Sequence, residues 1–193
     1  MSNVTIVTGI WDIGKITAEE LNALEMNDSK KIHSLEYRSY YTAAAGAEHY
    51  RLLTYISKRI SNADILDIGT YKGCSALALA ANHTNRVHSF CLSSQLDIED
   101  PPSNITFNVD NILADKYQEL IKKSSVILLD TMHTGTFERI FLDHIKAVGF
   151  KGILILDDIH LNNEMMSFWD DITDTKFNIT SIGHCTGTGV VDI

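Results

Sequence analysis

The feature that most constrains the fold is a short apolar segment that runs into two glycines and then into a helical pattern. Residues 63–68 are mostly apolar, Gly69 and Gly73 follow, and residues 73–82 are rich in alanine and leucine. Glycine permits a sharp turn and a close approach to a ligand, because it has no side chain to clash. In open α/β sheets, ligands bind at this place, outside the carboxyl ends of the strands. The pattern predicts a strand–turn–helix unit with a ligand at the turn; a plain structural junction is the alternative.

Helical and strand patterns alternate along the rest of the chain. Apolar residues spaced by three and four predict helices, and short apolar runs predict strands. Such alternation is typical of βαβ units and a mainly parallel sheet. The predicted helices are 48–61, 73–82, 113–123, 136–148 and 162–172. The predicted strands are 63–68, 86–92, 104–109, 125–130, 151–156, 176–182 and 189–193.

The last two predicted strands are joined differently from the others. Their connection, residues 183–187, is too short for a crossover helix, so these strands should form an antiparallel hairpin. We therefore predict an α/β fold in which a seven-stranded, mainly parallel sheet has helices on both faces and an antiparallel C-terminal hairpin. Residues 47–193 would make up this domain, and residues 1–46 an N-terminal extension.

The N-terminal extension is less regular. Residues 4–9 are predicted to form a strand and residues 18–26 a helix. The tyrosines that follow, Tyr37, Tyr40 and Tyr41, would either cover the mouth of the site or pack the extension against the domain. The sequence leaves both interpretations open.

Charge and hydropathy limit the partners. The net charge of −9 argues against nucleic acid, because binding a phosphate backbone requires a basic surface. No apolar stretch approaches the roughly 20 residues of a membrane helix, and the N-terminus lacks the pattern of a secretory signal. We therefore expect a cytoplasmic protein without nucleic-acid or membrane partners.

The glycine segment resembles motif I of the class I methyltransferases, which bind S-adenosylmethionine. Residues 69–75, with the sequence GTYKGCS, are similar to the GxYxGxS loop of catechol-type O-methyltransferases. The resemblance covers residues 48–193 and implies a Rossmann-like fold and a methyltransferase activity. The loop residues that it places at the cofactor are Asp67, Gly69, Thr70, Tyr71, Gly73 and Ser75.

Two further cofactor positions follow from the resemblance. The family usually has an acidic residue for the ribose hydroxyls after the second strand, but Cys91 stands there. A thiol is a weak hydrogen-bonding group, so Ser93 or Ser94 would have to substitute. After the third strand, Asp110 matches an acidic residue near the adenine; a helix N-cap is its alternative role.

Three aspartates follow the next two strands. Asp130 ends one strand, and Asp157 and Asp158 end the other. Neighbouring strands lie only about 4.8 Å apart, and converging carboxylates repel one another unless a cation is present. Oxygen ligands suit Mg²⁺ or a similar divalent ion, so we predict a metal site at these residues, with Asp130 also at the cofactor. The alternative is that one aspartate faces the cofactor without metal and another caps a helix.

His133 follows Asp130 by three residues, and histidine is a natural general base near neutral pH. Catechol-type enzymes place a lysine base at this offset, and the macrocin and mycinamicin sugar O-methyltransferases similarly carry a histidine after that aspartate. We therefore predict His133 as the catalytic base, with His160 as a second candidate for base or ligand.

These patterns predict a metal-assisted, S-adenosylmethionine-dependent O-methyltransferase that acts on a hydroxyl of a sugar, a glycan or another small molecule. Residues 5–15 resemble the opening of some glycosyltransferase-like sequences from polysaccharide gene clusters, which favours a glycan. A nicotinamide-dependent oxidoreductase is one alternative, although the dinucleotide glycine spacing is missing. A non-catalytic protein of this fold is another, favoured by Cys91. Whether the chain pairs with a second copy of itself stays open.

Overall fold

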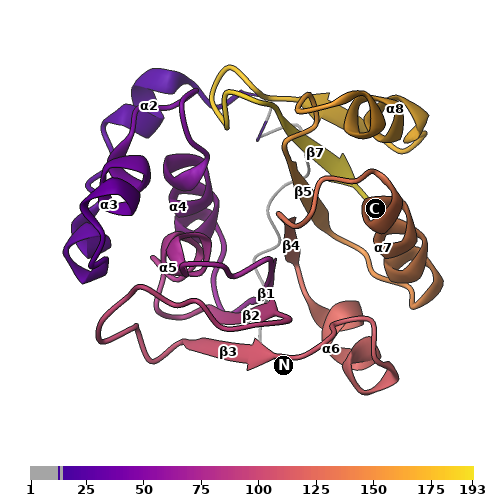
Figure 1. Cartoon of the computed structure of the whole chain (residues 1–193), viewed down its shortest axis with the longest axis horizontal. Helices are drawn as coiled ribbons and strands as arrows, with labels where there is room; N and C mark the ends of the chain where they lie inside the picture. The colour runs from indigo at the N-terminus through magenta and orange to yellow at the C-terminus, as the bar shows by residue number, and fades with distance from the viewer. Residues whose placement is uncertain (1–12, 14) are drawn as a thin grey trace.

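The computed structural model describes Ile13 and residues 15–193; the predicted strand at 4–9 lies outside these residues. Within the described residues, seven strands form one sheet with the order β3-β2-β1-β4-β5-β7-β6, and helices cover both of its faces (Figure 1). The strands are β1 (Asp64–Ile68), β2 (Arg86–Cys91), β3 (Ile105–Val109), β4 (Val126–Leu129), β5 (Ile153–Asp157), β6 (Lys176–Asn178) and β7 (Thr188–Asp192).

The pairing of the strands confirms the predicted architecture. Strand β1 pairs in parallel with β2 and β4, and the parallel ladder continues to β3 and β5. Strand β7 is the reversed strand, antiparallel to both β5 and β6. Strands β1, β4 and β5 are buried along their whole length, as continuous apolar runs require when helices cover both faces.

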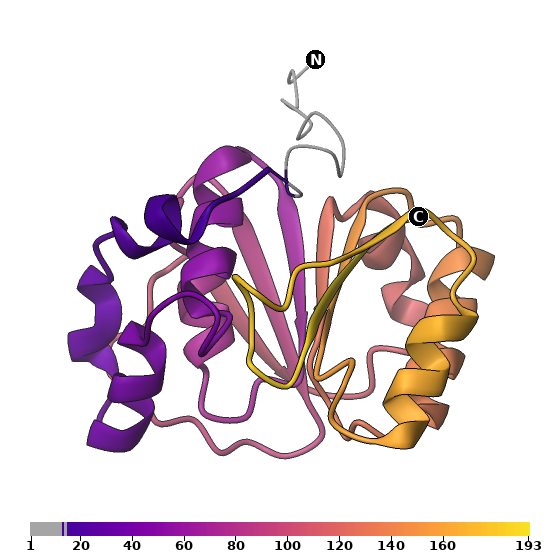
Figure 2. The same cartoon turned by 90° about the horizontal axis from the view of Figure 1, so that it is seen from above.

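The helices form two layers with the sheet between them (Figure 2). Each layer closes its own hydrophobic core against one face of the sheet. Among the described residues, no helix is both long and apolar enough to cross a membrane. The first layer holds α2 (Ala18–Asn22), α3 (Leu35–Thr42), α4 (Tyr50–Arg59) and α5 (Cys74–Leu79), and the second holds α6 (Gln118–Lys123), α7 (Thr136–Ala147) and α8 (Asn163–Asp171).

Several predicted elements are shorter than expected; the predicted helix 18–26, for example, ends at Asn22. The predicted strand 176–182 stops at Asn178, whose Oδ1 accepts hydrogen bonds from the backbone N–H and the hydroxyl of Thr180, at 3.1 and 2.6 Å. This is the turn that asparagine side chains favour. The predicted helix 113–123 is divided into a 3₁₀ turn, Asp115–Tyr117, and α6.

The described part of the N-terminal extension packs on α4. The Arg51 guanidinium donates to the carbonyls of Ala43 at 2.7 Å and Leu24 at 2.8 Å. Tyr41 is buried, with its ring 5.6 Å from that of Tyr50. These contacts attach the extension to the face of the sheet that α4 covers.

Candidate functional site

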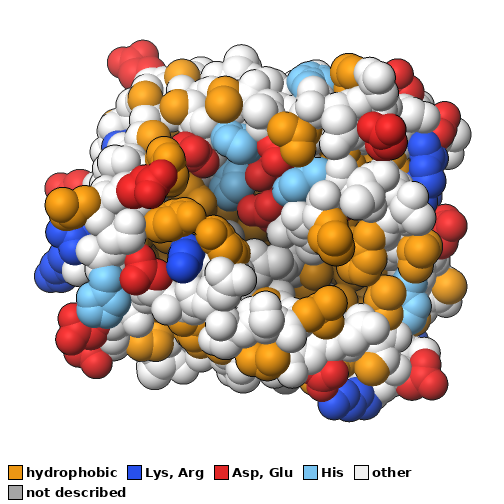
Figure 3. All heavy atoms as spheres, in the orientation of Figure 1, with side chains coloured by type: hydrophobic (Ala, Val, Ile, Leu, Met, Phe, Trp, Pro, Cys, Tyr) orange, Lys and Arg blue, Asp and Glu red, His pale blue; other side chains and the backbone are white. Residues whose placement is uncertain are grey.

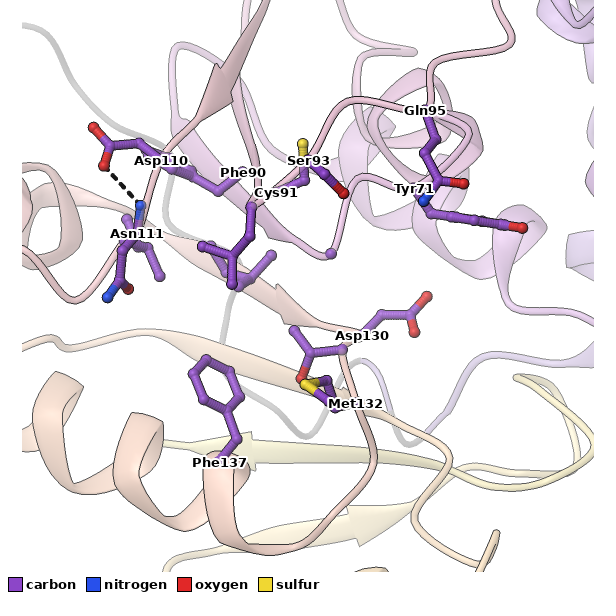
Figure 4. Close-up of a pocket in the computed structure, with 15 residues that line it drawn as sticks. Tyr71, Phe90, Cys91, Ser93, Gln95, Asp110, Asn111, Asp130, Met132 and Phe137 are labelled. Carbon is purple, nitrogen blue, oxygen red and sulfur yellow. Dashed lines mark hydrogen bonds between the residues drawn. The ribbon is translucent and has the colours of Figure 1, made fainter.

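A cavity of about 560 Å³ opens at the carboxyl ends of β1, β2 and β4, a volume typical of small-molecule sites. It lies where the strand order reverses between β1 and β4, which is where open α/β sheets bind ligands. Figure 4 shows Cys91 and Ser93 on one wall and Met132 and Phe137 on the other. The predicted cofactor residues that line the cavity are Gly69, Tyr71, Cys91, Asp110 and Asp130.

Gly69 directly follows β1 and packs between the ends of β2 and β4. Its backbone N–H donates to the carbonyl of Phe90 at 2.9 Å, and its φ is +115°. A Cβ at this position would lie 1.5 Å from the carbonyl oxygen of Asp130. The sequence predicts that this glycine makes room for a ligand; the structure shows that the backbone of Asp130 fills the space of the missing side chain.

The other predicted loop residues, Asp67, Thr70, Gly73 and Ser75, are not among those that line the cavity. They support the loop instead. Ser89 Oγ donates to Asp67 Oδ2 at 2.5 Å and lies 2.6 Å from Thr70 Oγ1. Gly73 has a φ of +91° directly before α5, where Ser75 is buried.

Asp67 retains one unsatisfied oxygen. Oδ1 is buried and accepts no hydrogen bond from the described residues. Burial raises the pKa of Asp67 to about 6, despite the hydrogen bond from Ser89. Since buried polar atoms normally have partners, this acceptor suits a water molecule or a ligand amine behind the glycine loop.

At the far end of the cavity, the side chain of Asp110 forms hydrogen bonds with residues that follow it closely in the chain. Its Oδ2 accepts hydrogen bonds from Lys116 Nζ at 2.5 Å and from the Tyr117 hydroxyl at 2.8 Å, and the Lys116 contact lowers the pKa of Asp110 to about 2. The N-cap position of the 3₁₀ turn that follows is Ala114, so Asp110 does not have the alternative role of a helix cap. Asp110 is an ionised residue of the cavity wall.

The residue predicted to lie at the ribose, Cys91, is not a carboxylate. Cys91 is half-buried, and its thiol lies 3.9 Å from the carbonyl of Asn108. Of the two predicted substitutes, Ser93 lines the cavity and Ser94 does not, whereas Gln95, which the sequence analysis did not consider, does. Ser93 and Gln95 are therefore the polar side chains nearest in sequence to the missing acid.

The predicted aspartates lie beside the cavity in a cluster that also contains histidines. His133 Nε2 is 3.3 Å from both Asp130 Oδ1 and Asp158 Oδ2. Figure 3 shows histidine and acidic side chains side by side at a hollow on this face. We call the following residues the strand-end cluster: Glu48, His49, Asp130, His133, Asp157, Asp158 and His184.

Asp157 lies between two further histidines, one of which, His184, also contacts Asp158. Its Oδ1 lies 3.1 Å from His49 Nδ1 and 3.4 Å from His184 Nδ1. Sequence reasoning missed both histidines, and Glu48 as well. His49 directly precedes α4, and His184 lies in the β6–β7 connection. The sequence around neither histidine contains a motif that predicts a place in a functional site.

The backbone at His133 is held in an uncommon conformation. Its φ is +52°, which costs free energy in a residue other than glycine and is frequent at functional sites. Glu138 Oε1 accepts the N–H of His133 at 3.0 Å, and Asn162 Nδ2 donates to its carbonyl at 2.8 Å. These bonds keep the ring between Asp130 and Asp158.

Histidines alone balance the charge of the cluster. Among the described residues, no lysine or arginine forms an ion pair with its carboxylates. Burial opposes protonation of His49, but Asp157 outweighs it and raises the pKa of His49 to about 9. Hydrogen bonds to Asp157 and Asp158 raise the pKa of His184 to about 11. Burial also opposes protonation of His133, yet the adjacent Asp130 gives a net increase in its pKa.

The donor atoms do not gather as the sequence predicts. In the part of the chain that the structure describes, one trio of possible metal ligands has its atoms within 4.8 Å of one another, and it is His49, Asp157 and His184. Asp130 and Asp158 both face His133, and Asp158 also lies 3.0 Å from His184 Nδ1.

His160 lies apart from the cluster. Its side chain is exposed, and Nε2 is 3.1 Å from Asn178 Nδ2. The structure therefore does not bring this second predicted candidate to the carboxylates.

Helix α3 reaches the mouth of the cavity. The Tyr37 hydroxyl donates to that of Tyr71 at 3.1 Å, and the two rings meet edge to face with centroids 5.8 Å apart. Tyr71 lines the cavity. The N-terminal extension thus packs on α4 through Tyr41 and also contacts the glycine loop through Tyr37.

No family model matches this chain, and no curated protein matches it. Solved structures do. Cofactor-bound Rv0187 from MTB aligns with a TM-score of 0.54 at 13% identity, covering 75% of this chain and 78% of that one. The SAH-bound methyltransferase PaMTH1 of Podospora anserina aligns with a TM-score of 0.52 at 13% identity, covering 75% and 77%. A candidate caffeoyl-CoA O-methyltransferase from Staphylococcus aureus gives 0.54 at 13%, covering 75% and 82%. The chain therefore has the fold of the class I methyltransferases, as predicted.

Proposed function

We propose that this protein is an S-adenosylmethionine-dependent O-methyltransferase that acts on a hydroxyl of a sugar, a glycan or another small molecule. The observation that carries the proposal is the position of Asp130, which lines the cavity at the glycine loop and also contacts His133. A cofactor-sized cavity and a histidine–carboxylate pair therefore meet at one residue. Methyl transfer to a hydroxyl needs both, because the donor and a proton acceptor must lie on either side of the acceptor oxygen.

The cavity fits the cofactor in size and chemistry. Phe90, Ile112 and Phe137 form an apolar part of the wall, which suits an adenine ring. Asp67 offers its unsatisfied buried oxygen behind the glycine loop. S-adenosylmethionine, when bound, would supply a methyl group on a positively charged sulfur, and the carboxylate of Asp130 favours that charge. Ser93 or Gln95 would hold the ribose in place of the acid that Cys91 replaces.

His133 would take the proton of the acceptor. A hydrogen on Nε2, shared by Asp130 and Asp158 at 3.3 Å, leaves Nδ1 as the basic nitrogen. The two carboxylates orient the ring and stabilise the imidazolium that forms, as the aspartate does in a serine–histidine–aspartate triad. The hydrogen bonds at the backbone of His133 keep this geometry before the acceptor arrives.

A divalent cation at the strand-end cluster belongs to the same proposal. Such an ion lowers the pKa of a hydroxyl beside it and orients the hydroxyl. The sequence predicts Asp130, Asp157 and Asp158 as its ligands, and Asp157 is the member of that set whose donor atom lies within 4.8 Å of those of His49 and His184. Methyl transfer should then stop in excess chelator; full turnover with chelator would exclude the cation.

The acceptor should be uncharged and rich in hydroxyl groups. The carboxylates of the cluster repel anions, and Tyr37, Tyr40 and Tyr71 present rings near the cavity mouth. Tyrosine rings combine an apolar face with a hydroxyl tip, which suits a sugar first and a catechol-like phenol second. We propose that α3 and these tyrosines cover the bound acceptor.

Calorimetric titration with S-adenosylmethionine and with its demethylated product tests the cofactor. Both should bind to the wild type. Cys91→Trp, which fills the cavity at the ribose position, should not bind them, whereas Cys91→Ser should bind like the wild type. Equal binding by Cys91→Trp would place the cofactor elsewhere. Transfer of a labelled methyl group to a panel of sugars and phenols then identifies the acceptor.

A further inference from the structure

Three side chains of the strand-end cluster form a compact group of their own. His49 Nδ1 and His184 Nδ1 approach the same oxygen of Asp157, at 3.1 and 3.4 Å, and one donor atom of each residue lies within 4.8 Å of the others. The residues come from the start of α4, the end of β5 and the β6–β7 connection. The packing of the whole domain therefore sets their geometry.

We propose that His49, Asp157 and His184 bind a divalent transition-metal ion such as Zn²⁺, in place of the all-carboxylate Mg²⁺ site that the sequence predicts. Imidazole nitrogen with one carboxylate suits zinc, iron and their neighbours, whereas Mg²⁺ prefers oxygen ligands. Three protein ligands leave a coordination position for another molecule. The use of that position by the acceptor hydroxyl rests on the proposed function; the binding of the ion does not.

The burial of His49 favours an ion over a simple ion pair. The residue is 2% exposed, and its Nε2 has no hydrogen-bond partner among the described residues. If His49 balanced Asp157 as an imidazolium, a charged N–H would be buried without an acceptor, which is costly. A neutral ring bound to a metal through Nδ1 removes the positive charge from the ring and leaves a neutral N–H at Nε2, which costs less than a charged one.

The surroundings of His184 also suit a ligand. Its Nδ1 lies 3.0 Å from Asp158 Oδ1 in addition to the Asp157 contact, so two carboxylates surround one nitrogen. Its other nitrogen, Nε2, is 3.8 Å from Glu48 Oε2. Metal-binding histidines usually donate this second nitrogen to an outer carboxylate, and Glu48 is the carboxylate on that side of the ring, beyond hydrogen-bond distance. An ion would replace the proton at Nδ1, so binding should release protons.

Metal titration of the chelator-stripped full chain tests the site. Zn²⁺ affinity is measured by competition with a chromophoric chelator and Mg²⁺ affinity by calorimetry, both without cofactor. We expect one Zn²⁺ per chain, bound about 100-fold or more tightly than Mg²⁺. His184→Ala should weaken Zn²⁺ binding by about 100-fold. Co²⁺ should show visible absorption bands with the wild type that His184→Ala lacks.

Two matched variants separate the rival sites. Asp130→Asn should retain Zn²⁺ affinity, because Asp130 contacts His133 and not the trio. His160→Ala, a change in the nearby β5–α8 connection, should also bind like the wild type. If Asp130→Asn abolishes metal binding and His184→Ala does not, the all-carboxylate site is correct and the proposal is wrong. Equal affinity for Mg²⁺ and Zn²⁺, or no Zn²⁺ binding by the wild type, would overturn it as well.

Circular dichroism and thermal unfolding establish that each variant is folded, and His49→Gln replaces His184→Ala if the latter is not. Titration of the metal-free chain with S-adenosylmethionine is a separate measurement. Zn²⁺ binding without cofactor binding would refute the proposed function and support the metal site. Cofactor binding without Zn²⁺ binding would support the proposed function and refute the metal site.

Discussion

The two edges of the sheet hold charged groups with different kinds of partner. At the amino edge, Asp64 at the start of β1 pairs with Arg86 at 2.8 Å, His88 at 3.1 Å and Lys123 at 3.5 Å. At the carboxyl edge, the described carboxylates of the strand-end cluster pair with histidines alone.

The difference separates a structural ion-pair cluster from a candidate reactive one. Burial opposes ionisation of Asp64, but Arg86 outweighs it and lowers the pKa of Asp64 to about 2. Arginine and lysine keep their charge at neutral pH, whereas histidine exchanges its proton and binds metals. Surplus carboxylates that only histidines balance lower the stability of the fold, because like charges repel one another. They are useful where a site must bind and release a proton or a cation.

The strongest test of the comparison uses one histidine from each edge. His133 and His88 each contact an aspartate through Nε2, so they form a matched pair. His133→Ala should slow methyl transfer by roughly 10²–10⁴-fold, the usual contribution of a positioned acid–base group. His88→Ala should leave the rate unchanged. Initial rates with a labelled methyl donor measure both, and a near-normal rate for His133→Ala would remove its role as base.

A second test compares the stability that a carboxylate contributes at each edge. Asp64→Asn should lower the free energy of unfolding by about 1–3 kcal/mol, because it breaks charged hydrogen bonds. Asp130→Asn should not lower it. Burial and the charge of Asp157 raise the pKa of Asp130, so its ionised form destabilises the folded state at neutral pH. Urea unfolding measures both variants; a larger loss for Asp130→Asn would reverse the comparison.

The stability that Asp64 contributes at the amino edge should also depend on pH. The pKa of Asp64 falls from 3.8 to about 2 on folding, so the folded state binds the proton less readily than the unfolded state. The stabilisation is therefore complete above about pH 4 and disappears as the pH falls through 2. The difference in unfolding free energy between the wild type and Asp64→Asn should shrink over this range. A constant difference down to pH 2 would mean that packing, not charge, causes it.

The smallest expected effect concerns strand β2, which supplies Arg86 to the amino edge and ends at the carboxyl edge in Cys91. Cys91→Asp places a carboxylate at the predicted ribose position and should tighten S-adenosylmethionine binding by about 3–10-fold, the typical net value of one hydrogen bond. Cys91→Asn controls for size. Weaker binding by Cys91→Asp would show that Ser93 and Gln95 hold the ribose in a way that excludes an acid.

Much of the fold could be predicted from the sequence, because its signals are local. The strands β1, β4 and β5 are short apolar runs, and their consecutive order brings Asp130 and Asp157 to neighbouring strand ends. The direction in which side chains point at the carboxyl edge of the sheet could not be predicted as well. Asp67 and Thr70 belong to the glycine motif, yet their side chains bond to Ser89 behind the loop.

The histidines of the trio could not be predicted for a different reason. His49 contacts a residue 108 positions away in the chain, and no periodicity links a helix start to a strand end at that separation. His184 belongs to a connection whose length predicts only a hairpin. Such contacts depend on how α4 and the β6–β7 connection pack over the strand ends, which is a property of the whole domain.

The insertion of β7 between β5 and β6 also bears on how the protein is made. Asp157 in β5 pairs with Thr188 in β7, and the connection that carries His184 directly precedes β7. During synthesis, a chain that has emerged only as far as β6 leaves β5 with an unpaired edge and the trio without its third member. Long-range β pairing of this kind forms late, so the carboxyl edge is assembled only when nearly all of the described domain has left the ribosome.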